Sequence, residues 1–109
     1  MATITADSVT DEQIRARIRS GFKDYGQIWC PHTATAAEVY TRLSPARRSQ
    51  GRWVLVATAH PAKFREIVEP LIDRQVAVPE SLGRLFELPS RAEEIAADVN
   101  ALRQGLEER

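Results

Sequence analysis

The apolar positions near the N-terminus repeat every four residues, with arginines between them. These positions are Ile14, Ile18 and Phe22. Such spacing is typical of an amphipathic helix. Thr10 and Gln13 fit a capping box at its start, and Gly26 suits a left-handed stop at its end. The pattern predicts a helix over residues 11–25.

The next apolar stretches are shorter. Residues 27–30 are largely apolar and are followed by a proline, which predicts a strand or a buried extended segment. A second helix is expected to follow. Thr33 or Thr35 can cap it, with Glu38 completing a capping box from Thr35, and it is expected to end at Ser44.

Residues 53–58 form a continuous apolar run that ends in a threonine. A continuous run is typical of a strand that is covered on both faces in a parallel sheet. Pro61 at a first helical position then predicts a third helix. A doubly covered strand needs neighbouring strands for its backbone hydrogen bonds, and the chain offers only short candidates, near Ile28 and Val76.

The fold expected from these elements is α/β and helix-rich. It is a fragment of a larger three-layer α/β domain, with one central strand over residues 53–58 and about four helices. The last of these helices is expected to open with a capping box from Ser90 to Glu93. Its apolar positions are Ala92, Ile95, Val99, Leu102 and Leu106.

Composition narrows the classes of partner. The chain has 109 residues, with 15 basic and 15 acidic side chains, so its zero net charge gives no reason to expect nucleic acid or an anionic membrane as a partner. Its start lacks the pattern of a secretory signal, and its one cysteine cannot form an internal disulfide. A cytoplasmic protein is expected. Four arginines are interpreted as a solvated loop: Arg42, Arg47, Arg48 and Arg52.

Two polar side chains, Thr58 and His60, lie where the predicted strand turns into the third helix. Ligands of open α/β sheets bind beyond the carboxyl ends of the strands, so Thr58 is a candidate ligand contact. The backbone N–H groups of Ala62 and Lys63 could receive an anion at the helix start. Alternatively, Thr58 and His60 simply cap the helix. Spacing alone favours the cap and leaves both interpretations open.

Other reactive side chains are few. Cys30, His32 and His60 could supply three zinc ligands, but no fourth ligand has a recognisable spacing. Cys30 and His32 could form a nucleophilic dyad, although a proline separates them, and a packed cysteine is the simpler interpretation. Lys23 and Lys63 are the only lysines, so one of them would have to form any Schiff base.

Longer strings resemble a known family. VLVATAHPAKF, residues 54–64, resembles a string near the C-terminus of threonine synthase, and PHTATAAEVY, residues 31–40, resembles a segment upstream of it. The likeness extends over about residues 7–106. Enzymes of this family use pyridoxal phosphate to convert O-phospho-L-homoserine and water to L-threonine and phosphate.

The resemblance implies roles for the strand-to-helix turn. Thr58 matches the hydroxyl that hydrogen-bonds the pyridine nitrogen of the cofactor, and His60 and Lys63 match neighbouring positions of the same motif. Lys63 does not match the Schiff-base lysine, which lies earlier in the family together with the loop that holds the cofactor phosphate. Residues 1–109 are therefore expected to form a single C-terminal segment that neither holds pyridoxal phosphate nor catalyses the reaction alone.

The partner implied by the resemblance is the remainder of the enzyme, in the same chain or in another. The alternative is a non-catalytic interaction module. It would pair through the exposed strand edges of residues 53–58 with a partner chain or with a second copy.

Overall fold

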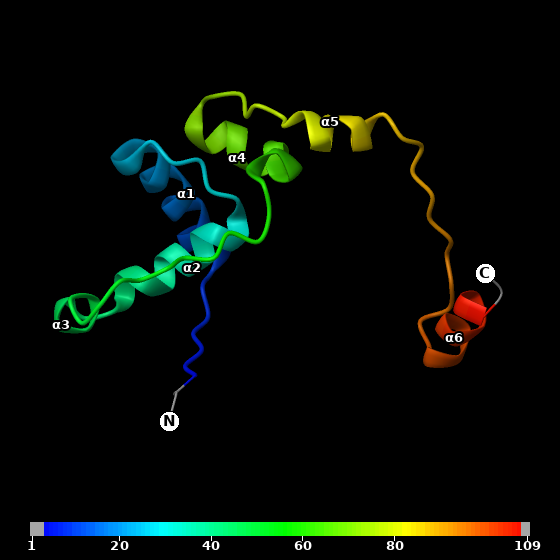
Figure 1. Cartoon of the computed structure of the whole chain (residues 1–109), viewed down its shortest axis with the longest axis horizontal. Coiled ribbons are helices and arrows are strands. Elements are labelled where there is room, and N and C mark those ends of the chain that lie inside the picture. The colour runs from blue at the N-terminus through cyan, green and yellow to red at the C-terminus, as the bar shows by residue number, and fades with distance from the viewer. Residues whose placement is uncertain (1–3, 108–109) are drawn as a thin grey trace. The chain divides into compact units, whose positions relative to one another are not determined.

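The structure is a computed structural model that describes residues 4–107, in two compact units, Met1–Pro79 and Glu80–Arg109 (Figure 1). Within residues 4–107 every regular element is a helix and there is no strand. The expected α/β fold with a central strand over residues 53–58 is therefore wrong for this chain. The physical reason is that a strand needs a hydrogen-bonded neighbour, and the described residues supply none to this segment.

The first helix, α1 (Asp11–Tyr25), confirms the predicted bounds. The Thr10 hydroxyl accepts a hydrogen bond from the Gln13 N–H at 3.4 Å, and the Gln13 side chain accepts one from the Thr10 N–H at 3.0 Å. Gly26 ends the helix with a φ of 64°, a conformation that glycine adopts without steric cost.

The second helix, α2 (Pro31–Arg42), begins before either predicted cap. Cys30 is the N-cap, and its sulfur accepts a hydrogen bond from the Thr33 N–H at 3.5 Å. Thr35 lies inside the helix and its hydroxyl donates to the Pro31 carbonyl at 2.9 Å, so the prediction of Thr33 or Thr35 as the cap is wrong. Ser44 caps the short helix α3 (Pro45–Arg48), which begins the expected loop.

The core of the first unit lies where α1 packs against α2 and α4 (Arg65–Ile72). The predicted third helix does begin at Pro61, but its first turn is the 3-10 helix η1 (Pro61–Phe64). The buried apolar side chains all belong to this unit: Ile18, Cys30, Ala34, Ala37, Ala62, Val68, Ile72 and Val76.

After α3, residues 53–59 run back beside α2 as an extended segment that forms no helix (Figure 1). The rings of Tyr40 and Trp53 lie 5.9 Å apart and join this segment to α2. The exposed fractions of Val54 and Val56 are 83% and 68%. The predicted strand residues thus lie on the surface rather than between two covering layers.

The second unit contains α5 (Glu80–Phe86) and α6 (Val99–Glu107). The final helix begins at Val99, so the prediction of a start at Ser90 is wrong. Asp98 caps it instead, because its carboxylate accepts hydrogen bonds from the N–H groups of Asn100 at 2.8 Å and Ala101 at 3.0 Å. No residue from 80 to 107 is buried, and a helix without a packing partner is marginal in water. Across residues 4–107, no helix has the length and apolar character needed to cross a membrane.

Candidate functional site

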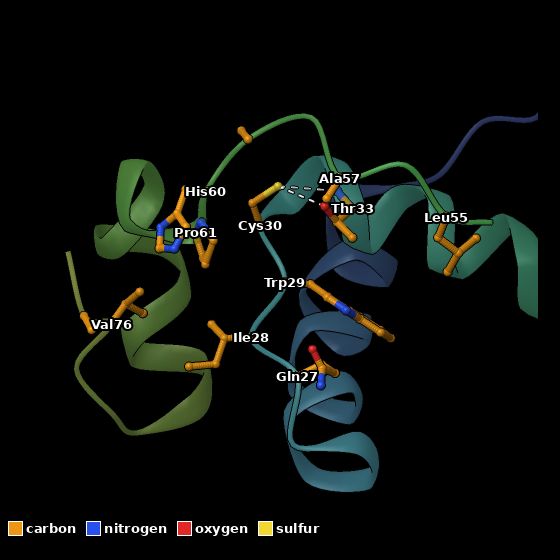
Figure 2. Close-up of a pocket in the computed structure, with 12 residues that line it drawn as sticks. Gln27, Ile28, Trp29, Cys30, Thr33, Leu55, Ala57, His60, Pro61 and Val76 are labelled. Atoms are coloured by element: carbon orange, nitrogen blue, oxygen red, sulfur yellow. Dashed lines mark hydrogen bonds between the residues drawn. The ribbon is translucent and has the colours of Figure 1, made fainter. Parts of the chain in front are cut away.

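Three connections of the first unit surround a hollow of about 600 Å³ (Figure 2). They are residues 27–30, between α1 and α2, residues 55–61, before and into η1, and Val76 with Ala77, after α4. These are the three places where the sequence suggests extended segments. The structure therefore brings together the expected neighbours of residues 53–58, without the hydrogen bonds of a sheet.

His60 forms the turn beside this hollow. Its Nδ1 atom accepts a hydrogen bond from the Ala62 N–H at 3.1 Å, and its carbonyl oxygen accepts one from the Lys63 N–H at 3.1 Å. The interpretation of His60 as a helix cap is confirmed. Because both N–H groups are engaged, the expectation that they receive an anion is wrong for this structure.

Thr58 does not cap the helix. Its side chain is exposed, and its hydroxyl has no hydrogen-bond partner within residues 4–107. Leu55, Ala57 and Ala59 line the hollow, whereas Thr58 alternates with them along the segment and shares the opposite side with the exposed residues Val54 and Val56. The hydroxyl therefore makes no hydrogen bond within residues 4–107 and lies at the end of an exposed apolar segment. A ligand contact from Thr58 stays a prediction.

Cys30 and His32 have separate partners. The Cys30 sulfur is buried and lies 3.3 Å from the Thr33 hydroxyl oxygen, while the His32 ring packs against Phe64 with ring centroids 5.2 Å apart. Because each side chain is held by a different group, they do not form a nucleophilic dyad. Across the part of the chain that the structure describes, no three His, Cys, Asp or Glu side chains are grouped as metal ligands. Lys63 is exposed on η1.

An ion-pair network joins α1 to α2 and was missed by sequence reasoning. Glu38 receives hydrogen bonds from Arg17 at 2.7 Å and from Arg42 at 3.3 Å, and Arg42 also donates to Asp7 at 2.6 Å. The hydrogen bond from Arg17 is the main cause that lowers the pKa of Glu38, and the hydrogen bond from Arg42 lowers the pKa of Asp7. Glu38 and Arg42 are four residues apart on one helix, which was the available signal.

The predicted solvated arginine loop is thus only partly a loop. Arg42 belongs to the network at the end of α2. Arg48 lies with its guanidinium carbon 5.9 Å from the centroid of the Tyr40 ring, and its carbonyl oxygen accepts a hydrogen bond from the Trp53 indole at 3.1 Å. These contacts hold the start of residues 53–59 against α2.

The residues at the turn fit one part of pyridoxal phosphate, the cofactor implied by the resemblance. The free Thr58 hydroxyl fits a ring nitrogen, which accepts a hydrogen bond. The start of η1 does not fit the phosphate, because its first N–H groups already bond to His60. This part of the protein therefore offers a contact to the ring and no cradle for the phosphate.

Comparison with known proteins identifies the family. The model of the threonine synthase C-terminal family matches residues 33–105. The chain is 32% identical over 97 residues to threonine synthase from Escherichia coli and 32% identical over 98 residues to that from Haemophilus influenzae, which covers 89% and 90% of this chain. The matches cover 22% and 21% of those relatives, so the chain spans about a fifth of their length. No solved structure matches. The chain belongs to the threonine synthase C-terminal family.

Proposed function

We propose that these 109 residues act as one C-terminal segment of a threonine synthase, a pyridoxal-phosphate enzyme that forms L-threonine and phosphate from O-phospho-L-homoserine and water. The observation that carries the proposal is the family match over residues 33–105, which includes the whole turn from Thr58 to Pro61. Since the chain spans about a fifth of its relatives, most of the active site comes from the other part of the enzyme.

The proposed role of Thr58 is to donate a hydrogen bond to the pyridine nitrogen. Two observations support it: the hydroxyl has no partner within residues 4–107, and it lies at the exposed end of an apolar segment. When bound, the cofactor serves as an electron sink for the substrate. A neutral hydroxyl leaves the ring nitrogen uncharged, whereas a carboxylate would stabilise its protonated form, so Thr58 moderates the electron withdrawal.

The neighbouring motif residues have different proposed tasks. His60 is a positioning residue, because its bond to the Ala62 N–H fixes the turn that follows Thr58. That bond requires an unprotonated Nδ1, so the neutral ring carries its proton on Nε2. Lys63 is the second candidate on the cofactor side, and its exposed side chain on η1 supports this role.

A chimera tests the proposal. In the Escherichia coli enzyme, the matched region is replaced by this chain, and phosphate release from O-phospho-L-homoserine is measured. We expect the chimera to be active and the 109 residues alone to be inactive. A folded but inactive chimera would overturn the proposed function. Phosphate release by the 109 residues alone would overturn the proposed incompleteness.

Variants of the chimera test Thr58 itself. Thr58→Val removes the hydroxyl and nearly conserves the volume, and it is expected to lower kcat at least about 10-fold, the effect of one lost hydrogen bond. Thr58→Ser keeps the hydroxyl and should stay within about 3-fold of the parent, well below the cost of losing that bond. The visible absorption of the bound cofactor should shift in Thr58→Val and return in Thr58→Ser. Equal activity and spectra in all three would refute the contact.

The exposure of Val54 at 83% and Val56 at 68% also favours a second candidate, a non-catalytic interaction module. If the chain is such a module, it should bind a partner or a second copy and add nothing to turnover. A folded but inactive chimera, together with a stable oligomer of the free chain, would support this function.

A further inference from the structure

The first unit has a second cavity, of about 440 Å³, whose walls come from α1, α2, α3 and the segments that connect them. Gln27, Trp29 and Leu55 line both this cavity and the hollow beside the turn (Figure 2). Neither Thr58 nor His60 lines it. The cavity is thus adjacent to the turn and separate from it, and its volume suits a small molecule.

The aromatic walls of this cavity are Tyr25, Trp29 and Tyr40, and their own contacts hold them in place. Three atoms of the Trp29 ring lie within 3.0 Å of the point where a Cβ atom of Gly21 would be, so the glycine leaves room for the ring. The ring centroids of Tyr25 and Trp29 lie 6.1 Å apart, and those of Tyr40 and Trp53 lie 5.9 Å apart. Because aromatic rings stack on one another, these walls favour a planar aromatic ligand.

The charges at this cavity do not balance. Arg17 and Arg48 line it, and no carboxylate does. Arg17 is neutralised by Glu38, whose carboxylate oxygen lies 2.7 Å from its guanidinium. Arg48 has no acidic partner within residues 4–107. The cavity therefore carries a positive charge, from Arg48, that no side chain of the described residues neutralises.

Arg48 also has an unsatisfied donor. Its Nε atom is buried and has no hydrogen-bond partner among the described residues. The Tyr40 ring, 5.9 Å from the guanidinium carbon, attracts the cation but offers no lone pair to this N–H group. Buried donors almost always have a partner, and a guanidinium can form two parallel hydrogen bonds with one carboxylate. The charge and the free donor of Arg48 thus favour a carboxylate.

We infer that this cavity binds a small planar aromatic carboxylate, with the ring against Trp29 and Tyr40 and the carboxylate on Arg48. The hydroxyl of Tyr25 and the side-chain amide of Gln27 also line the cavity, and neither has a hydrogen-bond partner within residues 4–107. They supply the few polar groups that orient a ligand in an apolar pocket. The inference goes beyond the proposed function and does not depend on it.

A phosphate ester fits this cavity less well. Near pH 7 a phosphate monoester carries about 1.5 to 2 negative charges, whereas only Arg48 has a charge that is not already neutralised. Burying the excess negative charge would be costly. A carboxylate carries one negative charge, which matches the one free guanidinium.

Calorimetric titration of the 109-residue chain tests the site, with 2-naphthoate as the ligand. We expect saturable binding with a dissociation constant below about 1 mM, the affinity of an ordinary ligand of this size. Uncharged 2-naphthalenemethanol should bind at least about 10-fold more weakly, because it cannot pair with the guanidinium. Cyclohexanecarboxylate should lose about as much, because its ring is smaller and cannot stack.

Two variants with matched chemistry locate the anion. Arg48→Gln removes the charge and should weaken the binding of 2-naphthoate at least about 10-fold. Arg47→Gln is the control, because Arg47 is the preceding residue of α3, is exposed and does not line the cavity; it should stay within about 2-fold of the parent, since it removes no contact. In the parent chain, the NMR signals of the Trp29 ring should shift during the titration, and those of Phe86 in α5 should not.

The opposite results would overturn the inference. Absence of saturable 2-naphthoate binding to the folded chain would remove the site. Equal affinity for 2-naphthalenemethanol, or tighter binding of inorganic phosphate, would refute the carboxylate as the ligand class. Equal losses in Arg48→Gln and Arg47→Gln, or binding that leaves the Trp29 signals unchanged, would place the ligand elsewhere. If Arg48→Gln unfolds, the titrations and the NMR shifts of the parent chain still decide the question.

Discussion

The α1–α2 pair and residues 53–59 lie side by side and differ in how their backbones are satisfied. Both helices bond their own N–H and C=O groups, are capped by Thr10 and Cys30, and bury Ile18 and Ala34. Residues 53–59 are more apolar than either helix, yet their backbone is unpaired and Val54 stays 83% exposed. A helix is completed by its own residues, whereas a strand is completed only by another strand. The helices of this unit therefore satisfy their own backbone groups, and the extended residues 53–59 do not.

The largest expected effect comes from removing a core side chain on the helical side. Ile18 is 0% exposed, so Ile18→Ala should lower the free energy of unfolding of the free chain by about 2–5 kcal/mol, from lost burial and the cavity left behind. Urea unfolding followed by far-UV circular dichroism measures it. The matched control Val56→Ala, at a position that is 68% exposed, should change stability by less than about 0.5 kcal/mol. Similar losses from both variants would erase the contrast between the two regions.

Gly21 tests how closely α1 approaches the chain that follows it. A Cβ atom at this position would lie 2.5 Å from the Trp29 ring. Alanine improves helix propensity by about 1 kcal/mol, but overpacking against a rigid ring costs about 1–3 kcal/mol, so Gly21→Ala should be net destabilising. Gly105→Ala in α6 is the control, because the added Cβ meets only Ile95 at 4.0 Å and should increase helicity. A higher thermal midpoint in Gly21→Ala would contradict the close approach.

The ion-pair network gives the helical side a dependence on pH. Arg17 and Arg42 lower the pKa of Glu38, so folding favours the charged carboxylate. Its stabilisation is fully present above the ordinary glutamate pKa of about 4.3 and is lost as pH falls through the lowered folded value. Glu38→Gln should cost about 1.5 kcal/mol at pH 7, with the difference shrinking below pH 4. Urea midpoints across pH 3–7 measure this, and a pH-independent difference would argue against the network.

The smallest expected effect concerns the exposed cap of α1. Thr10→Ala removes the side-chain acceptor of the Gln13 N–H and should cost about 0.5–1 kcal/mol. Thr10→Ser keeps that acceptor and is expected to match the parent. Thermal unfolding distinguishes them, and an unchanged midpoint in Thr10→Ala would mean that the network around Arg42 fixes the helix start without the cap.

Sequence reasoning succeeded where structure is decided locally. The bounds of α1 and the cap at His60 follow from side chains within three residues of the bond they make. Cys30 was missed as a cap because cysteine is not among the residues that prefer this position. The apolar pattern from Ala92 onward did predict a helix, but only its second half forms, since residues 80–107 bury nothing.

The predicted central strand over residues 53–58 is wrong for this chain, and the reason lies outside the segment itself. The pattern of residues 53–58 describes an environment, two covering layers and neighbouring strands, that the described residues do not contain. Its place at the end of the apolar run made Thr58 a candidate ligand contact, while spacing alone favoured a cap that the structure assigns to His60 alone. Local chemistry thus sets the turn, whereas a ligand contact from its first residue stays a prediction.

The uncharged, proline-free stretch at residues 53–59 also has a consequence for biosynthesis. Short segments with high strand propensity and no charge are prone to self-association into cross-β aggregates. The family model that matches this stretch describes the C-terminal part of threonine synthase, and the ribosome makes the C-terminal part of a chain last. In a threonine synthase, such a stretch would therefore be exposed to other chains for a shorter time than the same stretch placed near the N-terminus.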